Sequence, residues 1–211
     1  MSITIGIDFD NTIVSYDDLM YRAAVDHGLI GDGAEAVAKT KRAVRDRVRM
    51  LPGGEIAWQE LQALVYGPLM SQARATDGAE DFIRWCREAG FAVRIVSHKT
   101  EYANYDRTRT NLRTAALDWM AARRFFDRDG LNLGTDDVFF ESTRAGKIAR
   151  IAAIGCSHFI DDLEEVFLEP AFPPSVHRIL YAPGPSIVST ASARVMRSWE
   201  DVREYFLDHR A

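Results

Sequence analysis

The sequence contains little cysteine and no long hydrophobic run. Only two of its 211 residues are cysteine, Cys86 and Cys156, and both lie near apolar residues. We therefore expect two small buried side chains in a reducing cytoplasm and no disulfide framework. No uninterrupted apolar stretch is long enough to span a bilayer, so we expect no membrane partner.

The chain also lacks an excess of positive charge. It carries 26 Lys and Arg against 31 Asp and Glu, a net charge of −5, which argues against nucleic acid as a partner. No basic segment precedes the first apolar run, so we expect no signal peptide. The apolar fraction of 47% and the charged fraction of 27% are those of an ordinary globular protein. The sequence contains no signal for an oligomeric state.

The opening stretch places two acids directly after an apolar run. Residues 3–7 are rich in β-branched side chains and predict a strand buried on both faces. Asp8 and Asp10 follow two positions apart, so in an extended chain they point to the same side. Asn11 tolerates the left-handed conformation that a tight turn needs, and Thr12 can satisfy backbone groups after it.

Two carboxylates at the end of a buried strand suit a particular chemistry. One carboxylate can attack as a nucleophile while the other transfers a proton. Two adjacent anions repel each other unless a cation lies between them, and a hard divalent ion such as Mg²⁺ fits that place. The simpler alternative is that Asp8 and Asp10 only stabilise a turn.

After this stretch the apolar spacing is helical for about sixty residues. We expect helices over residues 17–27, 34–50 and 55–66. The second of these carries a basic arc, which is either a solvated face or a surface that attracts an anionic substrate. Arg22, Lys41 and Arg45 are candidate substrate contacts in this segment.

Strands and helices alternate from residue 77 onward. The expected strands cover residues 91–96, 137–140, 158–160 and 178–181, and the expected helices cover 79–89, 105–126, 144–154 and 199–207. This alternation predicts an α/β, Rossmann-like and mainly parallel sheet with helices on both faces. We assign residues 1–13 and 77–211 to this core and residues 14–76 to a small inserted helical domain.

Polar residues follow three later elements of this core. Ser97 comes directly after the second strand, where a hydroxyl can hold an anion or cap a helix. Lys147 lies in the first turn of a helix and either neutralises an oxyanion or faces solvent. Asp161 and Asp162 end another apolar strand, where they can bind Mg²⁺, or Asp162 can cap a following helix.

The order of these residues resembles that of the haloacid dehalogenase-like (HAD) superfamily over nearly the whole chain. The segment from Asp8 to Thr12 (DFDNT) is similar to its first motif, Ser97 to its second, Lys147 to its third and Asp161-Asp162 to its fourth. Residues 14–76 resemble the C1 cap domain of the family. Asn11 stands where the family often has glycine, and it tolerates similar backbone angles.

The resemblance implies a phosphatase that uses Mg²⁺ and acts on a small phosphorylated metabolite. Asp8 would form an aspartyl-phosphate, and Asp10 would protonate the leaving oxygen and then activate water. The Asp8 side chain, the Asp10 backbone carbonyl and Asp161 would hold Mg²⁺, with Asp162 in support. Glu165 is an alternative to Asp162 as the last group of the metal site.

The resemblance further implies a set of residues that position the phosphoryl group. The candidates are Asn11, Thr12, Ser97, His98 and Lys147. We expect His98 and its neighbour Lys99 to be solvated loop residues rather than catalytic groups.

Three other functions remain open at this point. The family also contains dehalogenases, which use the same nucleophile but do not need an acid two residues later, so Asp10 favours phosphoryl transfer. A phosphomutase would share the same residues and return the phosphoryl group to its substrate. A non-catalytic module that binds a phosphorylated ligand would keep the fold, and replacing Asp8 by Asn would change little in it.

Overall fold

The computed structural model describes residues 3–31, 37–184 and 189–209, and the chain divides into two compact units. The first unit comprises Met1–Val14, Ala75–Lys99 and Arg123–Ala211, and the second comprises Ser15–Arg74 and Thr100–Ala122. A two-stranded sheet pairs β2 (Val14–Ser15) with β3 (Arg74–Ala75), where the chain enters and leaves the inserted segment.

The first unit is built on a parallel sheet. Its strands are β1 (Thr4–Ile7), β4 (Ala92–His98), β5 (Val138–Glu141), β6 (His158–Asp161), β7 (His177–Tyr181) and β8 (Arg194–Met196). They lie in the order β5-β4-β1-β6-β7-β8, and each neighbouring pair is parallel. The expected α/β, Rossmann-like architecture is therefore confirmed.

The strand order reverses next to β1, and this reversal positions the candidate site. The chain builds the sheet outward from β1 through β4 to β5, and then outward from β6 through β7 to β8. Ile7 pairs with Ile95 of β4 and with Ile160 of β6, so the carboxyl ends of these three strands are neighbours. Open parallel sheets form their ligand sites outside the carboxyl ends at such a reversal.

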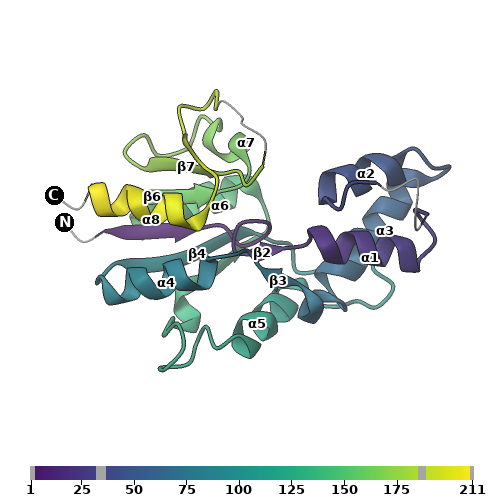
Figure 1. Ribbon diagram of the computed structural model, residues 1–211, viewed down its shortest axis with the longest axis horizontal. Helices are drawn as coiled ribbons and strands as arrows, with labels where there is room; N and C mark the ends of the chain where they lie inside the picture. Colours follow the sequence, from purple (N-terminus) through teal and green to yellow (C-terminus); the bar gives the residue numbers. More distant parts are fainter. Residues whose placement is uncertain (1–2, 32–36, 185–188, 210–211) are drawn as a thin grey trace. The chain divides into compact units, whose positions relative to one another are not determined.

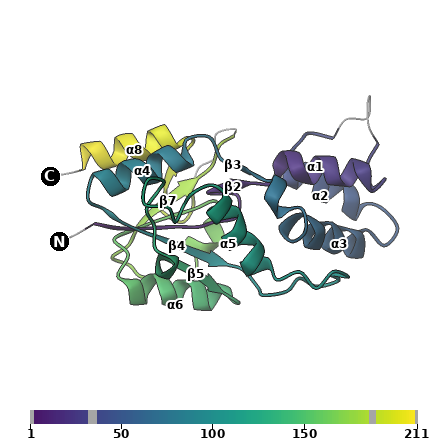
Figure 2. The same ribbon diagram turned by 90° about the horizontal axis from the view of Figure 1, so that it is seen from below.

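Helices cover both faces of this sheet (Figure 1; Figure 2). Those of the first unit are α4 (Ala79–Glu88), the 3₁₀ turn η2 (Thr135–Asp137), α6 (Arg144–Ile154), α7 (Glu164–Phe167) and α8 (Trp199–Asp208). On one face, α4 and α8 lie side by side and the Phe82 ring packs 5.1 Å from Trp199 and 5.9 Å from Phe206, centroid to centroid. On the other face, Ile148 and Ile151 of α6 join a buried apolar cluster.

Gly6 leaves room on β1 for the side chains of Phe159 and Cys156. A Cβ atom added at Gly6 would lie 2.5 Å from a ring carbon of Phe159 and 2.9 Å from the Cys156 sulfur. Cys156 and Cys86 are both buried and reduced, as expected for small core side chains. Packing at the centre of the sheet thus depends on the missing side chain at position 6.

The second unit is helical. It contains α1 (Asp17–Asp26), α2 (Lys41–Arg49), α3 (Gly54–Tyr66), the 3₁₀ turn η1 (Met70–Gln72) and α5 (Leu112–Ala122). Its interior buries Val44 and Val48 of α2 against the apolar sides of α1 and α3. The Trp119 indole of α5 donates a 2.9 Å hydrogen bond to the Ala73 carbonyl. This bond ties α5 to the inserted segment, whereas the sequence assigned residues 100–122 to the core.

The helix expected over residues 105–126 begins only at Leu112. Tyr105 and Arg109 have left-handed backbones, with φ of 58° and 52°. The Asp106 carboxylate accepts hydrogen bonds from the backbone N–H groups of Thr108 and Thr110, at 2.8 and 2.7 Å. These side-chain bonds compete with helical ones and hold the segment in a loop.

Two further elements differ from the expected ones. The helix expected over residues 34–50 is α2, with residues 34–36 outside the described ranges and Thr40 as the N-cap, accepting a 3.2 Å bond from Ala43 N–H. Strand β8 was not expected, and it pairs with β7 through Tyr181 and Met196. Among the helices that the structure describes, none has the length and apolar character needed to cross a membrane.

Candidate active site at the carboxyl ends of β1, β4 and β6

The turn after β1 has the predicted geometry. Asp8 directly follows the strand, and Asn11 adopts the left-handed conformation with a φ of 61°. The backbone N–H groups of Ile13 and Val14 both donate 3.0 Å hydrogen bonds to the Phe9 carbonyl, which closes the turn. Asp8 is buried with 5% of its surface exposed, so it is not a solvated residue of a surface turn.

Lys147 links two of the predicted acids. Its Nζ lies 2.6 Å from Asp8 Oδ1 and 2.6 Å from Asp161 Oδ2. Thr143 begins α6 as its N-cap and accepts a hydrogen bond from Gly146 N–H, which places Lys147 in the first turn of the helix. The Lys147 side chain is 2% exposed, so the solvent-facing alternative is wrong.

Burial and charge act together on these groups. Removal from water, reinforced by Asp161 and Asp10 and opposed by Lys147, raises the pKa of Asp8 to about 7. Burial alone would lower the pKa of Lys147, but the carboxylates of Asp8 and Asp161 raise it above its ordinary value. Lys147 is therefore a positive charge beside Asp8. A further positive charge, such as a metal ion, would favour the ionised form of the Asp8 carboxyl group.

Three carboxylates come together in a set that could hold a metal ion. One oxygen each of Asp8, Asp161 and Asp162 lies within 4.8 Å of the others. Hard oxygen ligands of this kind suit Mg²⁺, so the donor set fits the ion that the sequence predicts. Glu165 is not among the carboxylates that meet here in the described part of the chain.

The β6–α7 connection orients Asp161. Leu163, rather than Asp162, occupies the N-cap position of α7. The Leu163 N–H donates a 3.0 Å hydrogen bond to Asp161 Oδ1. Thr12 Oγ1 lies 3.5 Å from Asp162 Oδ1, which connects the turn after β1 to the end of β6.

Two buried hydroxyl groups belong to the predicted phosphate-binding set. Thr12 is 0% exposed and Ser97 is 1% exposed. Ser97 Oγ is buried and makes no hydrogen bond to any described residue. Buried hydroxyls normally have a partner, so an oxygen of a bound ligand would satisfy Ser97.

His98 is exposed, as expected, whereas Lys99 is buried. His98 is exposed at the end of β4, and its Nε2 lies 3.2 Å from the Ser142 carbonyl oxygen. Lys99 is 4% exposed, and its Nζ lies 3.0 and 2.9 Å from the two carboxylate oxygens of Asp10. The expectation that Lys99 is a solvated loop residue is therefore wrong.

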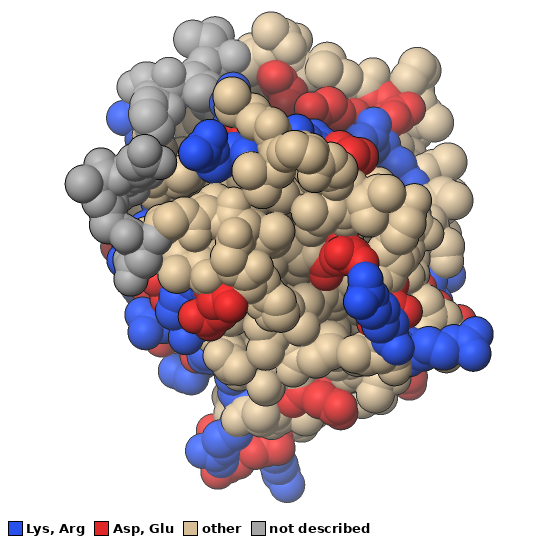
Figure 3. Space-filling view, turned by 90° about the vertical axis from the view of Figure 1, so that its right-hand side faces the viewer, with Lys and Arg blue, Asp and Glu red and all other residues tan. Residues whose placement is uncertain are grey.

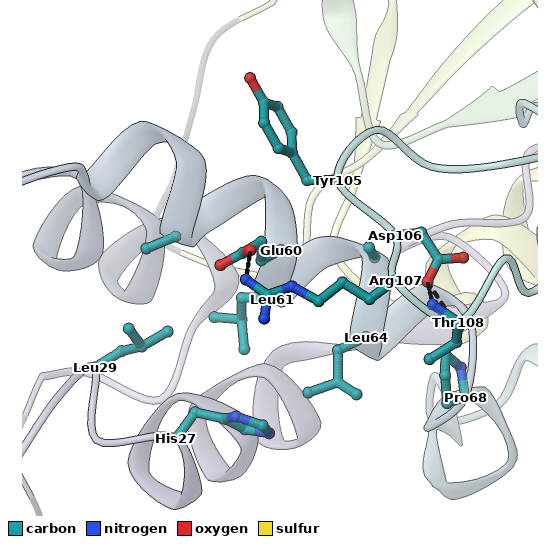
Figure 4. A pocket seen from close by; sticks show the side chains of 12 residues that line it. His27, Leu29, Glu60, Leu61, Leu64, Pro68, Tyr105, Asp106, Arg107 and Thr108 are labelled. Carbon is teal, nitrogen blue, oxygen red and sulfur yellow. Dashed lines mark hydrogen bonds and ion pairs between the residues drawn. The ribbon is translucent and has the colours of Figure 1, made fainter.

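A pocket lies wholly within the second unit, apart from these residues (Figure 4). The pocket has a volume of about 360 Å³ and lies between the end of α1, one side of α3 and the loop before α5. Leu29, Leu61 and Leu64 give it an apolar wall, and the Arg107 side chain reaches across to form a 2.8 Å ion pair with Glu60.

The candidate substrate contacts named from the sequence do not line this pocket. Arg22 pairs with Asp18 at 3.3 Å, and Arg45 pairs with Asp46 at 2.8 Å. The Lys41 ammonium lies 5.5 Å from the centre of the Tyr66 ring. The sequence missed the pocket because it assigned residues 105–108 to a helix.

Two neighbouring acids, Asp46 and Glu55, form ion pairs with three basic side chains of α2. Arg42 and Arg45 both pair with Asp46, and Arg49 pairs with Glu55 at 2.7 Å. On the face drawn in Figure 3, basic and acidic side chains are interspersed rather than gathered into one basic patch. The solvated-face interpretation of this helix agrees with these pairs.

The comparisons with known proteins identify the fold. No protein-family model and no curated protein matches the chain. A haloacid dehalogenase-like family hydrolase from Streptococcus pneumoniae matches at a TM-score of 0.62 and 13% identity, covering 97% of this chain and 98% of its own. A HAD family hydrolase from Deinococcus radiodurans, with bound phosphate and sodium, matches at 0.57 and 15%, covering 98% and 96%.

A third structure extends this likeness. A predicted phosphoglycolate phosphatase from Haemophilus somnus 129pt matches at a TM-score of 0.55 and 14% identity, covering 97% of each chain. At such identities the likeness establishes the fold. This protein therefore has the haloacid dehalogenase-like hydrolase fold along nearly its whole length.

Proposed function

We propose that the protein is a Mg²⁺-dependent phosphatase of the HAD superfamily that hydrolyses a small phosphorylated metabolite. The observation that carries the proposal is the buried group of Asp8, Lys147 and Asp161, joined by two 2.6 Å ion pairs at the carboxyl ends of β1 and β6. Transfer of a phosphoryl group depends mainly on positioning and on neutralising charge, and this group supplies both. The matched structures described as a phosphatase or with bound phosphate support the same reaction.

In the first step, an oxygen of the Asp8 carboxylate attacks the phosphorus atom. The bond from phosphorus to the leaving oxygen breaks, and Asp10 donates a proton to that oxygen. The products are an alcohol and an aspartyl-phosphate at Asp8. Lys147 and the hydroxyl groups of Thr12 and Ser97 would hold the phosphoryl oxygens.

In the second step, Asp10 takes a proton from a water molecule, which attacks the phosphorus of the aspartyl-phosphate. The bond from phosphorus to Asp8 breaks, which releases inorganic phosphate and restores the carboxylate. When bound, Mg²⁺ would neutralise charge on the phosphoryl group. Asp8, Asp161 and Asp162 would hold it through side-chain oxygens and Asp10 through its carbonyl.

Asp10 distinguishes this reaction from dehalogenation. Displacing a halide needs no proton donor for the leaving group, whereas release of an alkoxide does. Asp10 lies two residues after Asp8, and its carboxylate is held by the buried Lys99. A phosphomutase or a phosphate-binding module would use the same residues. Release of inorganic phosphate distinguishes a phosphatase from both.

The test is a phosphate-release assay on a panel of sugar phosphates, nucleotides and small organic phosphates that includes phosphoglycolate. The panel is run with Mg²⁺ and again with EDTA, on the natural protein, on Asp8→Asn and on Asp26→Asn. Asp26 is an exposed acid at the end of α1, so its replacement is a matched control.

We expect release that needs Mg²⁺, that is lost in Asp8→Asn and that is retained in Asp26→Asn. Equal turnover in Asp8→Asn and the natural protein would contradict the proposal. Tight binding of a phosphorylated compound without turnover would instead support a binding module, and conversion of one phosphate ester into its isomer would support a phosphomutase.

A further inference from the structure

Lys99 exchanges no proton and forms no bond in the two reaction steps, yet it contacts the proposed proton donor Asp10. Lys99 Nζ lies 3.0 Å from Asp10 Oδ1 and 2.9 Å from Asp10 Oδ2. The Lys99 side chain is 2% exposed and that of Asp10 is 21% exposed. A lysine almost without solvent contact thus reaches both oxygens of the proposed proton donor.

The alternation of β4 explains how Lys99 reaches this place. Ser97 and Lys99 are buried, whereas His98 between them is exposed, so the two buried side chains share one side of the chain. The Lys99 N–H donates a 2.9 Å bond to the Glu141 carbonyl, which continues the parallel pairing with β5. Ser97 and Lys99 therefore lie at the carboxyl end of β4, beside Asp8 and Asp10 at the carboxyl end of β1.

Stability alone does not account for this ion pair. Removing an ammonium group from water is costly, and its attraction to a carboxylate often only offsets that cost. Two apolar side chains of similar volume would commonly stabilise the fold as well or better. The ion pair between buried Lys99 and half-buried Asp10 is therefore better explained by a function in the site than by stabilisation of the core.

We infer that Lys99 is a positioning residue that fixes the Asp10 carboxylate for proton transfer. This inference rests on the proposed phosphatase reaction. Contact with both oxygens restricts the rotation of the Asp10 side chain, so the carboxylate is held before the substrate arrives. A displacement of a catalytic group by about 1 Å can lower a rate by about 10²-fold.

If Lys99 acts through Asp10, the effect of replacing Lys99 depends on the leaving group of the substrate. An alkyl phosphate releases a strongly basic alkoxide and needs a proton donor, whereas 4-nitrophenyl phosphate releases a stable phenolate and needs one far less. The ratio kcat/KM reports steps up to the first irreversible one, which here is departure of the leaving group. If Lys99 had a purely structural role, its replacement would lower kcat/KM equally for both substrates.

The experiment measures kcat/KM for the best alkyl phosphate of the panel and for 4-nitrophenyl phosphate. The variants are Lys99→Met, Lys99→Arg, Asp10→Asn and the double variant Lys99→Met with Asp10→Asn, which leaves no buried charge unpaired if Lys99→Met folds poorly. The exposed Lys39 provides a matched control, Lys39→Met. Each variant is also followed by thermal unfolding.

We expect Lys99→Met to lower kcat/KM by about 10²-fold for the alkyl phosphate and by clearly less for 4-nitrophenyl phosphate. Lys99→Arg should restore part of the loss, and Lys99→Met should have little further effect once Asp10 is Asn. Equal losses on both substrates, or an undiminished loss in the Asp10→Asn background, would overturn the inference. No phosphate release by the natural protein would instead overturn the proposed function, and the inference with it.

Discussion

Lys147 Nζ lies 2.6 Å from Asp8 Oδ1 inside the first unit, and both side chains are almost completely buried. The same ammonium lies 2.6 Å from Asp161 Oδ2, so a single cation lies between the acid that follows β1 and the acid that ends β6. Without this cation two buried carboxylates would repel each other. The contact therefore links the stability of the site to its chemistry.

Replacing Lys147 by Met should lower the free energy of unfolding by about 3–5 kcal/mol, because two buried carboxylates lose their partner. Denaturant unfolding without divalent ions measures the change, and added Mg²⁺ should reverse part of it. Lys39→Met, an exposed lysine changed in the same way, should stay within about 0.5 kcal/mol. The interpretation is wrong if both variants unfold at the same denaturant concentration as the natural protein.

Mg²⁺ should raise the unfolding temperature of the natural protein, by an amount that corresponds to about 2.7 kcal/mol at a hundredfold excess over Kd. Asp162→Asn should weaken this effect, because Asp162 is one of the three carboxylates that meet. Glu165→Gln should leave it unchanged. If Glu165→Gln weakened the stabilisation by Mg²⁺ and Asp162→Asn did not, Glu165 rather than Asp162 would belong to the metal site.

His158 predicts a pH dependence of stability at the other end of β6. Burial, reinforced by His177 and His209, lowers the pKa of His158 to about 4 from an ordinary value of 6.5. The unfolded chain then binds more protons than the folded one between these values, so this contribution to stability is lost as the pH falls from about 6.5 to about 4.

The pH dependence is measured by denaturant unfolding of the natural protein and of His158→Gln between pH 7 and pH 4. The natural protein should lose more stability than the variant, with a difference on the order of 2 kcal/mol. His27→Gln, at an exposed position outside the cluster, should follow the natural protein. Parallel curves for His158→Gln and the natural protein would show that His158 does not contribute.

Gly6→Ala should destabilise the sheet. The added Cβ would lie 2.5 Å from the Phe159 ring, and relief of that overlap should cost about 1–3 kcal/mol. Gly31→Ala adds the same group where nothing lies within 4 Å, so it should be nearly neutral. Thermal unfolding of the two variants compares them directly, and equal unfolding temperatures would contradict the packing at the centre of the sheet.

The sequence predicted those parts of the site that sit at the ends of regular elements. Asp8 follows a β-branched run, Asp161 ends another, and Lys147 lies in the first turn of a helix. In a parallel sheet these ends meet at one edge, so their proximity follows from the order of the elements. Residue type and strand order made these residues candidates, and the resemblance to the HAD superfamily joined them into one site.

Lys99 could not be assigned in the same way. Its burial depends on β4 continuing through His98, which the apolar run does not signal because it ends at Val96. Two further residues of extended chain, Ser97 and His98, place an expected loop lysine beside Asp10. The loop before α5 was missed for a related reason, because the Asp106 carboxylate binds backbone N–H groups that a helix would have used.

The central claim is that Asp8 is the nucleophile, and the most direct measurement is to trap its phosphoryl group. Asp10→Asn protein, which should be slow to hydrolyse the intermediate, is mixed with Mg²⁺ and 4-nitrophenyl phosphate, whose phenolate can leave without a proton donor. The mixture is quenched in acid, digested and analysed by mass spectrometry, with Asp8→Asn treated in parallel. We predict one added phosphoryl group on the peptide that contains residues 3–13, located at Asp8 and absent from Asp8→Asn. Phosphate release from the substrate with no phosphorylated Asp8, or the same modification in Asp8→Asn, would contradict the claim.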